Sequence, residues 1–258
     1  MMMTTKHVPV LAGAESFFHK GNEIGILLCH GFAGTPQSVG ELGKLLAAKG
    51  YTVYAPRLKG HGTTPLDFED CCFTDWIQNI EEAYKKLKKV CRRIFVAGQS
   101  MGGILAAHLA CRHQDIDGLI TINAALSVPG YEVFQHEIEP RFIPEGKPDI
   151  KADDIEEITY EAVPIKAVHN LLTLIKTTKP VLSEVTCPTL IFKSEEDHVV
   201  PASSSDVLFH AISSPFKQMV SLTNSYHVAS MDFDKDVIAE KTAAYIELCC
   251  SREYKLSV

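Results

Sequence analysis

The chain has 258 residues, 46% of them hydrophobic, and a formal net charge of −7. This hydrophobic share supports a large buried core and excludes a disordered chain, while the negative charge disfavours nucleic acid or an anionic membrane surface as a partner. No apolar run approaches the ~20 residues of a transmembrane helix, and Met1 to Lys6 contain no signal-peptide pattern, so we expect a cytoplasmic protein without integral membrane association.

The first 125 residues alternate short apolar runs with helical patterns, which is typical of an α/β fold. Strands are predicted at the apolar runs Ile24 to Cys29, Tyr51 to Tyr54, Ile94 to Ala97 and Leu119 to Ile122. Helices are predicted from the N-cap pair Thr35-Pro36 to Gly50, from Thr74 to about Val90, and from Met101 to Cys111.

Residues 126–185 interrupt this alternation with a proline-rich, acidic stretch. A helix is predicted at its end, from Pro164 to about Lys179, with one apolar face made by Ile165, Val168, Leu172 and Ile175. Strands then resume at Thr189 to Phe192 and Lys217 to Leu222, and helices at Ser203 to Ile212 and Asp234 to Leu248. We therefore predict a single domain over residues 1–258, in which the two outer pieces form one mostly parallel sheet flanked by helices and residues 126–185 are an insertion.

The motif Gly98-Gln99-Ser100-Met101-Gly102 lies between a predicted strand and a predicted helix. This context is typical of a nucleophile elbow, in which a strained turn projects a serine Oγ above the sheet. A side chain at Gly98 or Gly102 would collide with neighbouring backbone in such a turn. The sequence therefore predicts Ser100 as a nucleophile.

A serine hydroxyl reacts only when a base takes its proton, and an acid must orient that base. In the chain order Ser, Asp, His, two polar loops that follow strands supply candidates. Asp197 is the predicted acid, with Glu195 and Glu196 as its rivals, and His227 is the predicted base. His198 and His210 are interpreted as surface and packing residues.

The loop His30-Gly31-Phe32-Ala33-Gly34 follows the first predicted strand. Two backbone amides must stabilise the oxyanion that forms when a serine attacks a carbonyl. We predict that the amides of Phe32 and Met101 do so, with Gly31 permitting the turn. His30 is expected either to hold the loop by hydrogen bonds or simply to end the strand.

The cysteines and histidines do not form a recognisable metal motif, and no glycine-rich dinucleotide motif follows the first strand, so neither a metal nor a cofactor is predicted. Eight scattered cysteines are too sparse for a disulfide scaffold, which fits a reducing compartment. Cys29 ends an apolar strand away from the elbow and is not expected to be a nucleophile.

Together with Arg57-Leu58-Lys59-Gly60-His61-Gly62 and Asp75-Trp76, these motifs resemble the α/β-hydrolase superfamily, in particular its small bacterial carboxylesterases and monoacylglycerol lipases. The resemblance runs from about residue 24 to 250. It implies an α/β-hydrolase fold with Ser100, Asp197 and His227 as a triad and with Phe32 and Met101 as the oxyanion hole. It also implies that residues 126–185 form a small cap over an acyl pocket, although the apolar helix there could instead only complete the core.

We therefore expect an enzyme that cleaves carboxylic esters, its substrate being a small ester with an apolar acyl group. Two alternatives remain open. The same triad could act on thioesters, amides or carbon–carbon bonds, because fold and nucleophile are shared among these chemistries. Alternatively, the fold could bind a small apolar ligand without turnover.

Overall fold

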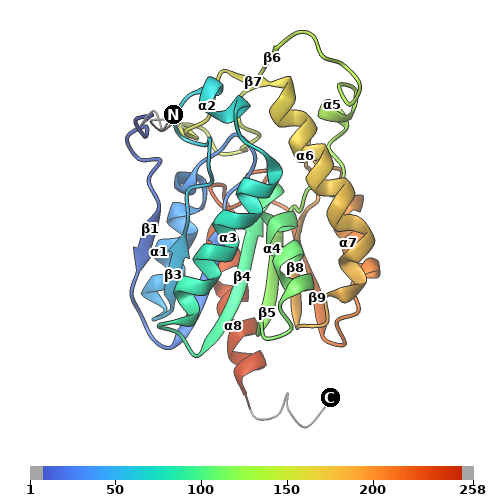
Figure 1. Cartoon of the computed structure of the whole chain (residues 1–258). Helices are drawn as coiled ribbons and strands as arrows, with labels where there is room; N and C mark the ends of the chain where they lie inside the picture. Colours follow the sequence, from blue (N-terminus) through green and yellow to red (C-terminus); the bar gives the residue numbers. More distant parts are fainter. Residues whose placement is uncertain (1–7, 252–258) are drawn as a thin grey trace, which may run out of the picture.

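The computed structural model describes residues 8–251, so the expectation about residues 1–6 lies outside the described part. Seven strands form one sheet in the order β1-β3-β2-β4-β5-β8-β9 (Figure 1). All neighbours in it are parallel except β1, which is antiparallel to β3. The strands are β1 (Phe17–His19), β2 (Ile24–Cys29), β3 (Thr52–Ala55), β4 (Arg93–Gln99), β5 (Gly118–Ile122), β8 (Thr189–Ser194) and β9 (Lys217–Leu222). The mostly parallel sheet predicted from the sequence is therefore present.

The central strands are almost entirely buried, because helices cover both faces of the sheet. This is why they appear in the sequence as continuous apolar runs rather than as an alternating pattern. Leu27 of β2 pairs with Val96 of β4, and Ala97 of β4 pairs with Ile120 of β5. This register brings the carboxyl ends of β2, β4 and β5 to one edge, where binding sites form in such sheets.

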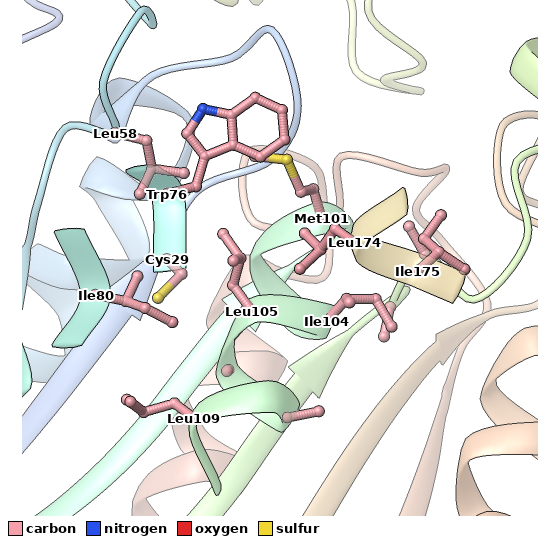
Figure 2. Close-up of a cluster of buried hydrophobic side chains, with 14 of the residues drawn as sticks. Cys29, Leu58, Trp76, Ile80, Met101, Ile104, Leu105, Leu109, Leu174 and Ile175 are labelled. Carbon is pink, nitrogen blue, oxygen red and sulfur yellow. The ribbon is translucent and has the colours of Figure 1, made fainter. Parts of the chain in front are cut away.

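Two helix layers enclose the sheet (Figure 1). Helices α1 (Gly40–Ala48) and α8 (Lys235–Cys250) cover one face, with the core residues Leu42 and Ile246. The other face is covered by α3 (Phe73–Lys88), α4 (Met101–Arg112) and α7 (Ser203–Ala211). In Figure 2, Leu105 and Leu109 of α4 lie beside Ile80 of α3 in this second core.

Thr35 caps its helix as predicted, since its side chain accepts a hydrogen bond from the amide of Gln37. The first turn, however, is a short 3-10 helix, η1 (Pro36–Val39), and α1 begins only at Gly40. The helix is followed by Gly50, whose φ of +94° is a left-handed conformation that favours glycine. The limits of this helical segment were therefore predicted correctly, but its change of helix type was not.

Residues 126–185 connect β5 to β8, which are neighbours in the sheet. They contain α5 (Pro129–Glu132), an antiparallel pair β6 (Phe142–Pro144) and β7 (Ala162–Pro164), α6 (Ile165–Thr178) and the 3-10 helix η2 (Lys179–Glu184). Only α6 was predicted; β6, β7, α5 and η2 were not, nor were β1 and α2 (Pro65–Glu69) outside this segment.

Helix α6 packs with its apolar face against α4. Leu174 and Ile175 lie beside Met101 and Ile104 (Figure 2). Of the four residues predicted on that face, Ile165, Val168 and Ile175 are buried, whereas Leu172 is only partly covered. Within residues 8–251, no helix has the length and apolar character needed to cross a membrane.

Candidate active site

Ser100 lies in the turn between β4 and α4, in the strand–turn–helix context that the sequence predicted. Its φ of 56° and ψ of −121° form a conformation that residues with a side chain adopt only at a cost in free energy. Hydrogen bonds hold the turn in place: the amide of Ser100 donates to the carbonyl of Ile122, and its carbonyl accepts from Gly103, both at 2.9 Å. The strain is therefore supported by the surrounding backbone.

The two glycines beside Ser100 are sterically required. A Cβ atom on Gly98 would lie 2.1 Å from the carbonyl oxygen of Gly102. A Cβ atom on Gly102 would lie 2.2 Å from the carbonyl oxygen of Cys29. Both neighbours are backbone atoms, which cannot move aside easily, so the collisions expected from the sequence are present in the structure.

His227 connects Ser100 to Asp197 through two hydrogen bonds. Its Nε2 lies 2.9 Å from Ser100 Oγ, and its Nδ1 lies 2.8 Å from Asp197 Oδ2. Only 7% of the His227 side chain and 2% of the Asp197 side chain are exposed, so water hardly competes for these bonds. An ionised carboxylate only accepts hydrogen bonds, so Nδ1 carries the proton and the Nε2 lone pair faces the serine hydroxyl. This tautomer is the one that a general base needs.

The loop after β8 explains why Asp197, and neither glutamate beside it, reaches His227. The second carboxylate oxygen of Asp197 accepts hydrogen bonds from the amides of Val199 and Val200, at 2.9 and 2.8 Å. These bonds turn the side chain inward, while Glu195 and Glu196 are exposed. The structure therefore brings Ser100, Asp197 and His227 together and leaves the two rival carboxylates in solvent.

The other histidines that the sequence set aside lie away from Ser100. His198 is exposed and places its Nδ1 2.8 Å from Asp149 Oδ1. His210 is exposed on α7, so its interpretation as a packing residue was wrong. Cys29 is fully buried, its thiol faces Ile80 and Leu105 in the core (Figure 2), and burial raises its pKa to about 12. A thiol in that setting is not a nucleophile at neutral pH.

The two amides predicted for the oxyanion hole come from two different segments of the chain. Met101 is the first residue of α4, so its amide belongs to the helix end where partial positive charge accumulates. Phe32 belongs to the loop after β2, and this loop passes close to the serine, because a Cβ on Gly31 would lie 3.5 Å from Ser100 Cβ. Within residues 8–251, neither amide donates a hydrogen bond to a protein acceptor.

His30 holds the Phe32 loop from within the core. Its Nδ1 donates to the carbonyl of Gly31 at 2.9 Å, and its Nε2 accepts from the amide of Leu58 at 3.2 Å. The carbonyl of Gly31 can only accept and the amide of Leu58 can only donate. The ring of His30 therefore carries its proton on Nδ1 and is neutral. Burial lowers the pKa of His30 to about 4, which keeps it neutral. Of the two roles expected for His30, the structure therefore shows the first, in which its hydrogen bonds hold the loop.

The left-handed residue of this loop is Ala33, with a φ of 59°, and Gly31 is not left-handed. The turn therefore does not use a left-handed glycine at position 31. Instead, the glycine that meets a close neighbour is Gly34, where a Cβ would lie 2.6 Å from Glu157 Oε1. A side chain at position 34 would therefore require the Glu157 carboxyl group, which comes from the insertion, to move.

Glu157 is a residue of the site that the sequence analysis missed. It lines the same cavity as Ser100 and His227. Burial raises the pKa of Glu157 to about 7, and the positive charge that His227 carries when protonated opposes part of this rise. The only sequence signal was a small residue at position 34, and that signal does not identify its neighbour.

Asn123 was also missed. It directly follows β5 and has a φ of 47°, a left-handed conformation that asparagine tolerates better than most residues. Its side-chain nitrogen donates to the carbonyl of His227 and to Ser194 Oγ, both at 2.8 Å, and its Oδ1 accepts from the amide of Ser194. One side chain thus joins the end of β8 to the His227 loop. An asparagine after a buried strand was the available signal.

Ser100 and His227 line a cavity of about 90 Å³, most of whose remaining wall comes from residues 126–185. Apolar side chains in the wall are Phe32, Val128, Leu171, Val199 and Val228. Besides Ser100 and His227, its polar side chains are Gln99, Tyr131, Glu145, Lys147, Asp149, Glu157 and Thr159. The hydroxyl of Tyr131 donates to both carboxylate oxygens of Glu145, at 2.8 and 2.7 Å. A single ligand in this cavity can therefore contact apolar side chains and donate hydrogen bonds to carboxyl groups.

The raised pKa of Glu157 predicts a pH-dependent effect of Glu157→Gln on stability. Between pH 4.5 and 7 the folded protein binds this proton more tightly than the unfolded chain does, so the wild type loses stability as pH rises through this range. Glutamine cannot ionise. Relative to the wild type, the variant should therefore gain about 2–3 kcal/mol in free energy of unfolding between pH 5 and pH 8.

Urea unfolding of both proteins at the two pH values measures this gain. Glu156→Gln is the matched control, because the Glu156 side chain is exposed to water in the folded state as in the unfolded chain. Equal gains in the two variants would show that burial of Glu157 is not the cause.

Comparison with known proteins agrees with this geometry. Residues 22–234 match the family model described as serine aminopeptidase, S33. The chain is 44% identical to the thermostable monoacylglycerol lipase of Bacillus sp. (strain H-257), over 93% of this chain and 97% of that protein. It is 26% identical to a carboxylesterase of Bacillus subtilis (strain 168), over 90% of this chain and 96% of that protein.

A solved structure from work on LipS and LipT, two metagenome-derived lipolytic enzymes, superimposes with a TM-score of 0.90 at 39% identity. The match covers 93% of this chain and 99% of that one. The nucleophile elbow, the sheet order and these similarities lead to one conclusion: the chain belongs to the serine aminopeptidase S33 family of α/β-hydrolases.

Proposed function

We propose that this protein is a serine hydrolase that cleaves carboxylic esters, with monoacylglycerols as its preferred substrates. The observation that carries the proposal is the continuous hydrogen-bonded series from Asp197 through His227 to Ser100, at the wall of a cavity with both apolar and carboxylate lining. The 44% identity to a monoacylglycerol lipase over nearly the full length supports the substrate class.

In the acylation step, Ser100 Oγ attacks the ester carbonyl carbon while His227 Nε2 takes the hydroxyl proton. The carbonyl oxygen becomes an oxyanion, which accepts hydrogen bonds from the amides of Phe32 and Met101. Asp197 stabilises the imidazolium that forms and keeps its orientation. When the tetrahedral intermediate collapses, His227 returns the proton to the departing alcohol oxygen, and the acyl group remains bonded to Ser100.

In the deacylation step, water takes the place of the alcohol. His227 Nε2 removes a proton from the water as it attacks the acyl carbon, and the proton then passes to Ser100 Oγ as the acid leaves. The same donors stabilise the second oxyanion. Each turn of the cycle therefore returns Ser100 and His227 to their starting protonation states.

The lining of the cavity suits an amphiphilic ester. Apolar walls, Leu171 among them, match an acyl chain, because burying each methylene contributes about 0.8 kcal/mol. The carboxyl groups of Glu145 and Glu157 can accept hydrogen bonds from the hydroxyls of a glycerol group. A simple alkyl ester would leave these acceptors without a substrate partner, which favours the monoacylglycerol.

We propose further that residues 126–185 act as a cap, because they supply most of the wall facing Ser100. The cavity of about 90 Å³ is well below the ~300 Å³ at the lower end of ligand pockets. A long acyl chain therefore needs part of the cap to shift outward. Helix α6 is compatible with both expectations for its apolar face: Ile175 of that face packs in the core, and Leu171, which was not among the predicted face residues, lines the cavity.

Rates across matched esters test the proposed substrate class. For p-nitrophenyl esters from acetate upward, kcat/KM should rise about tenfold for every two methylenes until the acyl pocket is filled. Monolauroylglycerol should be cleaved at least about tenfold faster, in kcat/KM, than methyl laurate, because only the former presents glycerol hydroxyls to the half-buried carboxyl groups of Glu145 and Glu157.

A thioester and an anilide with the same lauroyl group complete the panel. Faster cleavage of the thioester or the anilide than of monolauroylglycerol would contradict the proposal in favour of thioesterase or amidase activity. Saturable binding of the esters without turnover would instead support a binding protein.

A further inference from the structure

Asp149, in the insertion, contacts the loops of both His227 and Asp197. Its Oδ2 accepts hydrogen bonds from the amide of His227 and from the amide of His198, each at 3.1 Å. Its Oδ1 lies 2.8 Å from His198 Nδ1, and this hydrogen bond raises the pKa of His198. Only 15% of the Asp149 side chain is exposed. One carboxylate therefore joins residue 227 to the residue directly after Asp197.

The backbone around Asp149 is also hydrogen-bonded to the loop of His227. The carbonyl of Asp149 accepts from the amide of Val228 at 3.0 Å. The fully buried carboxylate of Asp232 accepts from the amides of Lys151, Ala152 and Tyr226, at 2.7, 3.0 and 3.0 Å. The segment of the insertion that carries Asp149 is thus docked on both sides of His227.

The position of these bonds matters for catalysis. The loops of Asp197 and His227 follow different strands, β8 and β9, and their side chains must meet within hydrogen-bond distance. A carboxylate oxygen that receives one amide from each loop fixes the separation of the two backbones. Small errors in such geometry are costly, since a misplacement of about 1 Å can lower a rate about 100-fold.

We propose that Asp149 is a positioning residue, through which the cap segment sets the spacing between the Asp197 and His227 loops. Full turnover then requires this segment to be docked. The inference rests on the proposed function of the triad and concerns a residue that does not touch the reacting atoms. Nothing in the sequence indicated it, because an aspartate in an acidic stretch carries no sign of its distant partners.

The test compares Asp149→Ala and Asp149→Asn with the wild type, using p-nitrophenyl butyrate as substrate. Asp153→Ala is the matched control, because Asp153 lies in the same acidic stretch and is exposed. Rates are expressed per active site, and the active sites are counted by complete labelling with a fluorophosphonate. A smaller fraction of folded protein therefore does not change the measured kcat. Both kcat and KM are measured.

Asp149→Ala should lower kcat about 10- to 100-fold and leave KM within about threefold. Asp149→Asn should keep kcat within about threefold of the wild type, because its Oδ1 can still accept from both amides. Asp153→Ala should match the wild type. If Asp149 had only a structural role, Asp149→Ala would lower the number of active sites that take the label and would leave kcat per active site unchanged.

If the wild type is active and Asp149→Ala has the same kcat, the inference about Asp149 is wrong, whereas the proposed function stands. Equal losses in the alanine and asparagine variants, or a loss confined to KM, would also overturn it. If Asp149→Ala does not fold, Asp149→Ser replaces it with the same expectation, since its shorter side chain cannot reach both amides. A wild type that neither cleaves esters nor takes the label would reject the proposed function itself.

Discussion

Alanine at position 100 is expected to lower kcat for ester hydrolysis by about 10⁵- to 10⁶-fold. The substitution removes the oxygen that lies 2.9 Å from His227 Nε2 and with it the acyl-enzyme route. The oxyanion amides remain, so slow hydrolysis by water is the residual activity. Release of lauric acid from monolauroylglycerol, followed by titration, measures the loss.

The fold should survive this change. Alanine keeps the Cβ atom that the turn already accommodates, and the backbone bonds of Ser100 to Ile122 and Gly103 do not involve Oγ. Ser203→Ala, an exposed serine at the start of α7, is the matched control and should retain wild-type kcat. Turnover of purified Ser100→Ala within tenfold of the wild type would exclude Ser100 as the nucleophile.

Asp197→Asn should lower kcat about 10⁴-fold while leaving the loop in place. The asparagine Oδ1 can still accept from the amides of Val199 and Val200, so its NH₂ group faces His227. An NH₂ group donates, and Nδ1 must then accept, which moves the ring proton to Nε2. His227 then presents a donor to Ser100 and cannot take its proton.

Steady-state kinetics with the same substrate measure this effect, and Glu195→Gln serves as the control. Glu195 is exposed in the same loop, so its substitution should leave kcat unchanged. A loss of less than tenfold in Asp197→Asn would contradict the assigned role of Asp197, as would equal losses in the two variants.

The parts of the fold that the sequence predicted correctly are those set by local composition. Strands β2 and β9 match their predicted limits, because a buried strand between turn residues leaves a continuous apolar signal. Ser100 was identifiable because the steric needs of its turn require glycine at positions 98 and 102, close by in the sequence. His227 and Asp197 followed from the order in which such sites place their residues along the chain.

The parts that were missed depend on contacts between distant residues. Strands β1, β6 and β7 have three residues each, too few to show a period. Glu157 and Asp149 lie in an acidic stretch in which exposed and buried carboxylates look the same. Only the folded chain shows that Glu157 lies against Gly34 and that Asp149 receives the amides of His198 and His227.

These two carboxylates share a feature that changes how the insertion is understood. Both come from residues 126–185. Glu157 lines the cavity beside Ser100, and Asp149 accepts hydrogen bonds from the loops of His227 and Asp197. Glu157 offers the cavity a carboxyl group with a pKa of about 7, and Asp149 bonds the backbone of the catalytic loops. In the proposed account, the insertion therefore supplies groups that line the cavity and accept hydrogen bonds from the loops of His227 and Asp197.

In the proposed mechanism, Ser100 is a nucleophile that His227 activates. Labelling of the purified protein with a fluorophosphonate, followed by digestion and mass spectrometry of the peptides, tests it most directly. We predict one adduct, on Ser100, that is absent in Ser100→Ala and forms far more slowly in Asp197→Asn. An adduct on another residue, or no adduct in a preparation that cleaves monolauroylglycerol, would contradict the assignment.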